Sequence, residues 1–237
     1  MINLIFDIDD TLYDQLKPFK DAFNKVFDKY KNIPCMELYK KSRKYSDDVF
    51  EQTEKGILSV EDMHIYRITK AFYDYGIKIK IEDAIKFQKE YALNQNKIKI
   101  SKGMLEVLDF AKKNNIVMGI LTNGSIVHQT NKVKTLGLEK WICINNIFIS
   151  ESMNISKPYV RAFEFVENRM GIDPNCTYYI GDSLNNDVVG AKRAGWKMIW
   201  INRRNHIIPK DFKFYPDYTV EDDKELVKIL KIILNLK

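Results

Sequence analysis

The sequence lacks several patterns that mark common classes of protein. Its three cysteines are widely spaced and odd in number, so they form neither a zinc-binding pattern nor a disulfide framework. No apolar stretch approaches the roughly 20 residues that a membrane helix needs. Acidic residues interrupt the apolar run near the N-terminus, which argues against a signal peptide. We therefore expect a cytoplasmic protein without a membrane partner.

Signals for nucleotide-cofactor or nucleic-acid binding are also missing. The chain contains no G-x-G sequence and no glycine followed by Lys-Ser or Lys-Thr, so the phosphate-binding loops of nucleotide-binding proteins are not indicated. The formal net charge of +6 comes mainly from lysines spread along the chain, most of which we interpret as solvated helix faces. We expect no nucleic-acid polymer as a partner.

The order of the apolar patterns predicts an α/β protein with a helical insertion. With 237 residues, of which 45% are hydrophobic and 30% charged, the chain is long enough for one globular domain plus an insertion. Residues 16–97 show helical periodicity without a strand pattern, and Ser59 can cap one of the helices. Further along, helical and strand patterns alternate, as in a doubly wound parallel sheet.

We therefore predict a Rossmann-like core of residues 1–15 and 98–237, with an inserted all-helical domain over residues 16–97, in a monomer or a homodimer. The expected strands are residues 2–6, 116–121, 147–149, 177–180 and 197–201. The expected helices are residues 19–30, 36–51, 59–75 and 82–95 in the insertion, and residues 103–114, 126–136, 158–170, 187–194 and 222–236 in the core.

The N-terminal stretch carries the first candidate site. Residues 2–6 are apolar except for Asn3 and are followed by charge, which predicts a strand at the centre of a parallel sheet. Asp7, Asp9 and Asp10 follow at its carboxyl end, where open α/β sheets bind their ligands. Carboxylates this close repel one another unless a cation or a shared proton relieves the repulsion. The stretch indicates a cation site, with a solvated polar turn as the alternative.

Further polar residues are expected at or just beyond the ends of other strands: Thr122 with Asn123, Lys157, and Asp182 with Asp187. A carboxylate nucleophile approaches a phosphate dianion only with help from a cation, an ammonium group and N–H donors. Asp7 and Asp182 can hold Mg²⁺, and Lys157 can supply the ammonium group. Residues 122–124 open a helix whose N–H groups favour an anion. Taken singly, the threonine could be a simple helix cap and the lysine a surface residue.

These motifs, in this order, resemble the signature motifs of the haloacid dehalogenase superfamily. The residues that carry the resemblance are 7–11, 121–124, 156–158 and 181–187. Residues 189–195 and 200–203 are similar to the subclass that carries a helical cap between its first two motifs. The resemblance covers the whole chain and implies that the inserted helical domain is that cap.

The resemblance also implies catalytic roles in the hydrolysis of a phosphate monoester. Asp7 is implied to be the nucleophile that becomes phosphorylated. Asp9 is implied to protonate the leaving oxygen and then to activate the attacking water. Asp10 stands where many members of the family carry glycine, although a form with aspartate is also familiar.

Binding roles are implied in the same way. Mg²⁺ is expected to bind Asp7, the main-chain carbonyl of Asp9 and Asp182, with Asp187 supporting from nearby. Thr122, Asn123 and Lys157 are expected to bind the phosphoryl group, and Lys157 also to take part in catalysis.

The expected substrate is a small phosphorylated metabolite. The Asp-x-Asp-Asp-Thr-Leu form of the first motif resembles a branch that contains pyrimidine 5′-nucleotidases, which implies a nucleoside 5′-monophosphate. Sugar phosphates and phosphoglycolate are alternatives, as is a phosphomutase. A dehalogenase needs neither the metal nor the second acid, and a phospho-receiver domain carries its phosphorylated aspartate on a later strand. Candidate substrate contacts in the helical domain are Phe19, Phe23, Arg43 and Tyr45, with a structural or solvated position as the alternative.

Overall fold

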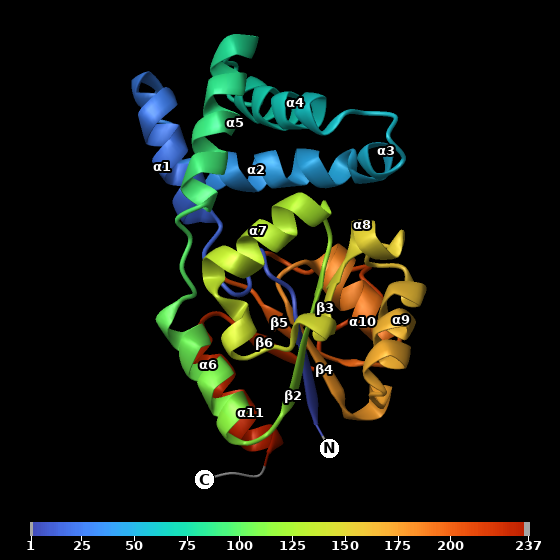
Figure 1. Ribbon diagram of the computed structural model, residues 1–237. Coiled ribbons are helices and arrows are strands. Elements are labelled where there is room, and N and C mark those ends of the chain that lie inside the picture. The colour runs from blue at the N-terminus through green and yellow to red at the C-terminus, as the bar shows by residue number, and fades with distance from the viewer. Residues whose placement is uncertain (1, 235–237) are drawn as a thin grey trace. The chain divides into compact units, whose positions relative to one another are not determined.

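The chain folds as two units, one continuous in sequence and one interrupted by it. The computed structural model describes residues 2–234. The interrupted unit comprises Met1–Asp14 with Lys99–Lys237, and the continuous unit comprises Gln15–Ile98. The first contains the strands, whereas the described elements of the second are all helices (Figure 1).

The interrupted unit is built on a six-stranded sheet in which every neighbouring pair of strands is parallel. The strands are β1 (Asn3–Phe6), β2 (Val117–Thr122), β3 (Ile147–Ile149), β4 (Thr177–Gly181), β5 (Lys197–Ile201) and β6 (Tyr218–Val220). Their order in the sheet is β3-β2-β1-β4-β5-β6. This arrangement confirms the predicted doubly wound parallel fold and places β1 between β2 and β4.

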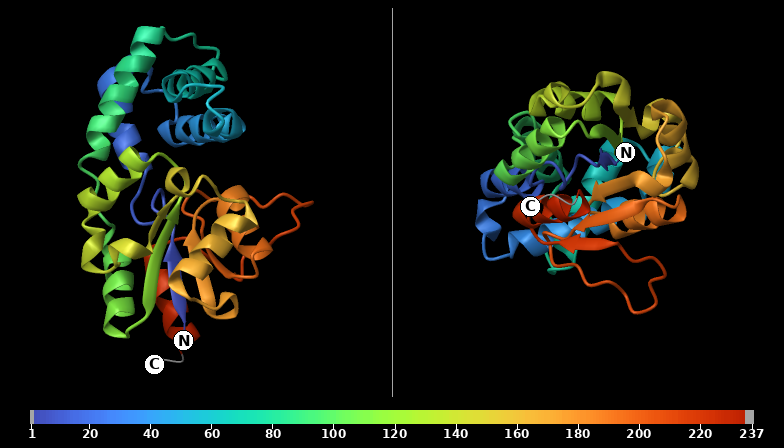
Figure 2. Two further views of the ribbon diagram at one scale, coloured as in Figure 1. Left: turned by 45° about the vertical axis from the view of Figure 1, so that its right-hand side comes forward. Right: turned by 90° about the horizontal axis from the view of Figure 1, so that it is seen from below.

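Helices cover both faces of the sheet; α6 and α7 lie on one side, and α9 and α10 on the other (Figure 2). The helices are α6 (Lys102–Lys113), α7 (Ile126–Leu136), α8 (Ser150–Met153), α9 (Val160–Met170), α10 (Val189–Arg193) and α11 (Asp223–Ile233). Shorter turns are η2 (Leu138–Lys140), η3 (Ile144–Asn146), η4 (Pro174–Cys176) and the π-helical η5 (Leu184–Val188). Ser125 is the N-cap of α7, and its Oγ accepts the N–H of His128, which satisfies one of the free donors of the first turn.

Large apolar side chains fill the space between the sheet and helices α9 and α10. Phe163 packs edge-on against Tyr179 and Trp196, with ring centroids 5.5 and 5.3 Å apart. A Cβ added at Gly190 would lie 2.4 Å from the Phe163 ring, so α10 needs a glycine to pack this closely. This cluster sets the distance at which α9 and α10 pack against β4.

The continuous unit consists of α1 (Leu16–Val26), η1 (Asp28–Tyr30), α2 (Cys35–Asp48), α3 (Phe50–Glu54), α4 (Val60–Tyr73) and α5 (Ile81–Gln95). Its core is rich in aromatic rings, and Phe27 contacts the rings of Phe23, Tyr30, Phe72 and Phe87. Phe19 and Phe23 belong to this core with only 2% of their surface exposed. Their position therefore matches the structural alternative rather than substrate contact.

Most predicted elements are present, and α7, β3 and β5 have the predicted bounds. Strand β6 was not predicted. Pro158 was expected in the first turn of α9, but it precedes that helix, whose N-cap is Tyr159. Helix α11 ends at Ile233 among the described residues, and residues 235 and 236 of its predicted range lie outside them. None of the helices in residues 2–234 has both the length and the apolar character needed to cross a membrane.

The aromatic core of the helical unit predicts a large loss of stability when Phe27 is truncated. Phe27 is fully buried, so Phe27→Ala should lower the free energy of unfolding of this unit by about 3–5 kcal/mol. Ile57→Ala is the control, because Ile57 is 74% exposed and its truncation should change stability by less than about 0.5 kcal/mol. Urea unfolding followed by circular dichroism measures both, and a similar loss in the two variants would contradict the prediction.

Candidate active site

The carboxyl ends of three adjacent strands bring the first, second and fourth motifs together. Asp7 directly follows β1, Thr122 is the last residue of β2, and Asp182 directly follows β4. The N–H of Asp7 donates to the carbonyl of Ile180 at 2.9 Å, which continues the pairing of β1 with β4. Because β1 lies between β2 and β4, residues far apart in the sequence meet at one edge of the sheet.

The third motif reaches this edge through a buried lysine. Lys157 is 2% exposed, and its Nζ donates to Asp7 Oδ1 at 2.9 Å, to Asp187 Oδ1 at 2.7 Å and to the Tyr179 hydroxyl at 2.7 Å. These three acceptors match the three N–H groups of an ammonium. Burial alone would lower the pKa of Lys157, but Asp187 and Asp7 raise the pKa above its ordinary value, so the side chain stays charged.

Asp7 lies in an environment that disfavours its charged form. Burial raises the pKa of Asp7, Lys157 lowers it, and the neighbouring Asp187 and Asp9 raise it, with a result of about 6 compared with an ordinary value of 3.8. Asp7 is thus a buried carboxylate with more proton affinity than usual, crowded by like charges. A cation bound beside it would relieve that crowding.

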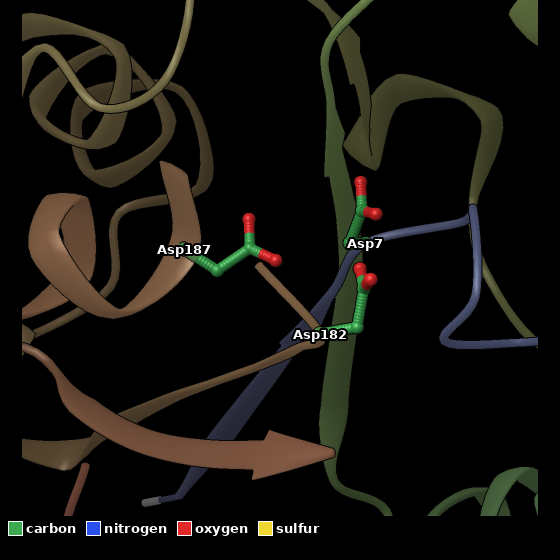
Figure 3. A group of neighbouring side chains, drawn as sticks. All are labelled: Asp7, Asp182 and Asp187. Atoms are coloured by element: carbon green, nitrogen blue, oxygen red, sulfur yellow. The ribbon is translucent and has the colours of Figure 1, made fainter. Parts of the chain in front are cut away.

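Asp7, Asp182 and Asp187 form an acidic cluster (Figure 3). Each offers one oxygen that lies within 4.8 Å of the others. Lys157 bonds Asp7 and Asp187 within this cluster, and a divalent cation would further offset the repulsion among the three carboxylates. Carboxylate oxygens are also the ligands that Mg²⁺ prefers. The residues therefore fit a divalent metal ion.

Asp187 is held in place by its own turn. Its Oδ2 accepts the N–H of Ser183 at 2.9 Å, while its Oδ1 accepts the Lys157 ammonium. A Cβ added at Gly181 would lie 2.3 Å from Asp187 Oδ2, so glycine is required for this close approach. The π-helical turn η5 thus directs a carboxylate back to the end of β4.

Asn123 joins the second motif to the third. Its Nδ2 donates to the carbonyl of Lys157 and its Oδ1 accepts the N–H of Lys157, both at 2.9 Å. This pair of bonds fixes the main chain that carries the buried ammonium. Thr122 is also buried, with 1% exposure. Phosphate binding by Thr122 and Asn123 stays a prediction, and the Asn123 side chain has the additional task of positioning Lys157.

Two residues that the sequence analysis did not single out contact Asp9. Lys132 forms an ion pair with its carboxylate, and Gln129 donates a hydrogen bond to it. Both come from α7 and are buried, although most lysines were expected to be solvated. One signal could have revealed them: Gln129 and Lys132 share the helical spacing of the buried Val133 and Leu136, which predicts polar groups on an inward face.

Asp10 has a structural partner. Its φ of 53° is in the left-handed region, where glycine is favoured and aspartate is tolerated. Arg204 donates to both of its carboxylate oxygens, from Nε at 2.9 Å and from Nη2 at 2.5 Å. This bidentate pair fixes the turn that follows β1.

The raised pKa of Asp7 predicts that Asp7→Asn stabilises the metal-free protein at neutral pH. Because folding raises the pKa of this carboxyl, ionised Asp7 opposes folding, and the penalty grows as the pH rises from about 4 to about 6. The uncharged amide removes that penalty, so the gain should be on the order of 2 kcal/mol near pH 7 and should vanish below about pH 4. Unfolding of both proteins in chelator at the two pH values measures the difference. An equal gain at both would contradict the prediction.

Comparison with known proteins identifies related chains. Residues 4–201 match the haloacid dehalogenase-like hydrolase family. A glyceraldehyde 3-phosphate phosphatase of Methanocaldococcus jannaschii is 27% identical over 246 residues, covering 99% of this chain and 97% of the relative. The pyrimidine 5′-nucleotidase PynA of Streptococcus pneumoniae is 25% identical, covering 96% of this chain and 94% of the relative.

Solved structures share the fold. The HAD-hydrolase YfnB of Bacillus subtilis, solved with bound magnesium, has a TM-score of 0.72 at 23% identity and covers 97% of this chain and 98% of its own. A dehalogenase has a TM-score of 0.77 at 18% identity, covering 97% of this chain and 96% of its own. Likeness at these identities shows the fold alone. The family match includes all four motifs, and the chain belongs to the haloacid dehalogenase-like hydrolase family.

Proposed function

We propose that this chain hydrolyses small phosphate monoesters with Mg²⁺ through an aspartyl phosphate formed on Asp7. The proposal rests on one observation, the buried Lys157 ammonium bonded to Asp7 and Asp187 within a cluster that also includes Asp182. This arrangement combines a carboxylate nucleophile, a fixed positive charge and oxygen ligands for a metal. A phosphate dianion requires all three to react with a carboxylate.

The enzyme class is supported by the relatives. The two quoted above match nearly the whole chain and are named as a glyceraldehyde 3-phosphate phosphatase and a pyrimidine 5′-nucleotidase. Both names describe the hydrolysis of a phosphate monoester. With the family match, this makes the chain a phosphoric monoester hydrolase.

The proposed reaction has two steps. In the first, an oxygen of Asp7 forms a bond to phosphorus, the bond from phosphorus to the ester oxygen breaks, and Asp9 gives the departing oxygen a proton. The Lys157 ammonium offsets negative charge beside the reacting carboxylate. In the second, water attacks phosphorus, Asp9 accepts a proton from the water, and the bond to Asp7 breaks. The products are an alcohol and inorganic phosphate.

The metal would be held by Asp7 and Asp182, with Asp187 nearby and the main-chain carbonyl of Asp9 as a further oxygen ligand. When bound, Mg²⁺ would shield the carboxylates from the substrate and stabilise charge on the phosphoryl oxygens. The hydrogen bonds of Asp187 to Ser183 and Lys157 agree with a supporting position for this carboxylate. The magnesium bound to YfnB supports the choice of ion.

Two substrate classes have support. The first motif favours a pyrimidine nucleoside 5′-monophosphate, and PynA is a relative that acts on such compounds by name. The relative from Methanocaldococcus jannaschii supports a phosphorylated triose. Asp9 distinguishes both from a dehalogenase, whose reaction requires no acid to protonate an ester oxygen.

A panel of phosphate esters tests the proposed function. Inorganic phosphate should be released with Mg²⁺ from at least one of glyceraldehyde 3-phosphate, other sugar phosphates, phosphoglycolate and uridine 5′-monophosphate. Asp7→Asn should abolish the release, because the amide cannot form the acyl phosphate. Isomerised sugar phosphate without free phosphate would instead indicate a phosphomutase. Halide release from a 2-haloacid in chelator would indicate a dehalogenase.

The metal assignment predicts different effects for Asp182→Asn and Thr122→Ala. The first removes a charge from the metal ligands, whereas the second removes a hydroxyl from the predicted phosphate contacts. Asp182→Asn should therefore raise the Mg²⁺ concentration needed for half-maximal activity by about 10-fold or more, and Thr122→Ala should change it by less than about threefold. Stabilisation by Mg²⁺ in thermal unfolding gives a second readout without substrate. If both variants needed the same Mg²⁺ concentration for half-maximal activity, Asp182 would not be a metal ligand.

A further inference from the structure

The carboxylate of Asp9 is surrounded by hydrogen-bond donors. Lys132 Nζ lies 2.8 Å from Oδ1 and 2.5 Å from Oδ2. Gln129 Nε2 donates to Oδ2 at 3.2 Å, and the Tyr13 hydroxyl donates to Oδ1 at 2.5 Å. Both oxygens therefore have donors from α7, and one also has a donor from the turn after β1. Such a set restricts the rotation of a side chain that is 18% exposed.

The two donors from α7 are themselves fixed. Gln129 and Lys132 are three residues apart, so they lie on the same face of the helix, and they are only 3% and 6% exposed. Gln129 Nε2 also donates to the carbonyl of Asn123 at 2.9 Å. One amide therefore bridges the second motif and the Asp9 carboxylate.

The position of Lys132 has a physical cost that its contact with Asp9 offsets. Desolvating an ammonium is unfavourable unless a carboxylate pairs with it. A lysine on an exposed face of α7 would avoid that cost, as Lys134 does on the same helix. The burial of Lys132 therefore indicates that this ammonium is placed to bind the Asp9 carboxylate.

We infer that Lys132 and Gln129 are positioning residues that hold the Asp9 carboxylate in the orientation used for both proton transfers. This inference rests on the proposed function, because it assigns a task to residues that act through Asp9. A general acid must lie within hydrogen-bond distance of the oxygen that it protonates, and a carboxylate free to rotate would spend less time there.

A positioning role predicts a dependence on the leaving group. Phenyl phosphate and p-nitrophenyl phosphate have similar shapes, but nitrophenolate is the better leaving group and needs less protonation. Lys132→Met should slow phosphorylation of the enzyme by phenyl phosphate about 10- to 100-fold and by p-nitrophenyl phosphate clearly less. KM should change by less than about threefold, because the substrate contacts are unaltered. Single-turnover rapid-quench kinetics measures the step directly.

Matched variants separate positioning from a general loss of structure. Lys134→Met removes a lysine from the exposed face of α7 and should leave both rates unchanged. Lys132→Arg should restore most of the activity, since a guanidinium can also donate to both carboxylate oxygens. Thermal unfolding verifies that each variant is folded. Should Lys132→Met fail to fold, two other variants test the same contacts: Lys132→Gln, which keeps an N–H donor, and Gln129→Met, which changes no charge.

A double-mutant cycle decides whether Lys132 acts through Asp9. In the Asp9→Asn background, Lys132→Met should cause no further loss for phenyl phosphate, because the group that it positions is already gone. Three outcomes would overturn the inference. Lys132→Met could slow the reactions of the two esters equally, it could slow phenyl phosphate as much in the Asp9→Asn background as in the wild type, or it could turn over faster than the wild type. Normal turnover by Asp9→Asn itself would overturn the proposed function. A slow Asp9→Asn enzyme together with a normal Lys132→Met enzyme would overturn the positioning role alone.

Discussion

The rest of the active site depends on the buried ammonium of Lys157. One nitrogen bonds Asp7 after β1, Asp187 in η5 and Tyr179 within β4, so it connects three segments at one edge of the sheet. Without the carboxylates, a buried ammonium would be unfavourable by roughly several kcal/mol, and without the ammonium the carboxylates would repel one another. Burial of the ammonium therefore depends on its carboxylate partners, and this set of ion pairs forms only when the three segments are folded side by side.

The three aspartates of the first motif differ in their cationic partners. The pairs are Asp7 with Lys157, Asp9 with Lys132 and Asp10 with Arg204. The first pair is buried beside two other carboxylates, which suits a nucleophile next to a metal. The second is more exposed, which suits the proposed exchange of protons with substrate and water. The third is bidentate on a left-handed residue, which suits a structural role. Neighbouring residues of one type thus lie in different electrostatic environments.

Much of the fold could be predicted because its signals are local. The apolar run before Asp7 and the alternation of strand and helix after residue 98 are properties of short windows, and they indicated the parallel sheet. Strand β6 gave no such signal, because a threonine interrupts its apolar residues, whereas the equally short β3 is apolar throughout. Only its pairing with β5 defines β6. Lys132 was hidden for a related reason, since most lysines on helices are solvated and only tertiary contacts distinguish one that is not.

The candidate site was predictable for the acids and less so for their partners. The aspartates lie close together in the sequence, whereas Lys132, Lys157 and Arg204 come from three distant segments. The topology decides which cation meets which acid, because β1 lies in the middle of the sheet and the loops and helices that follow its neighbours converge on its end. Asp7 faces the third and fourth motifs, whereas Asp9 contacts α7. Two carboxylates only two residues apart can therefore act as nucleophile and acid without sharing a partner.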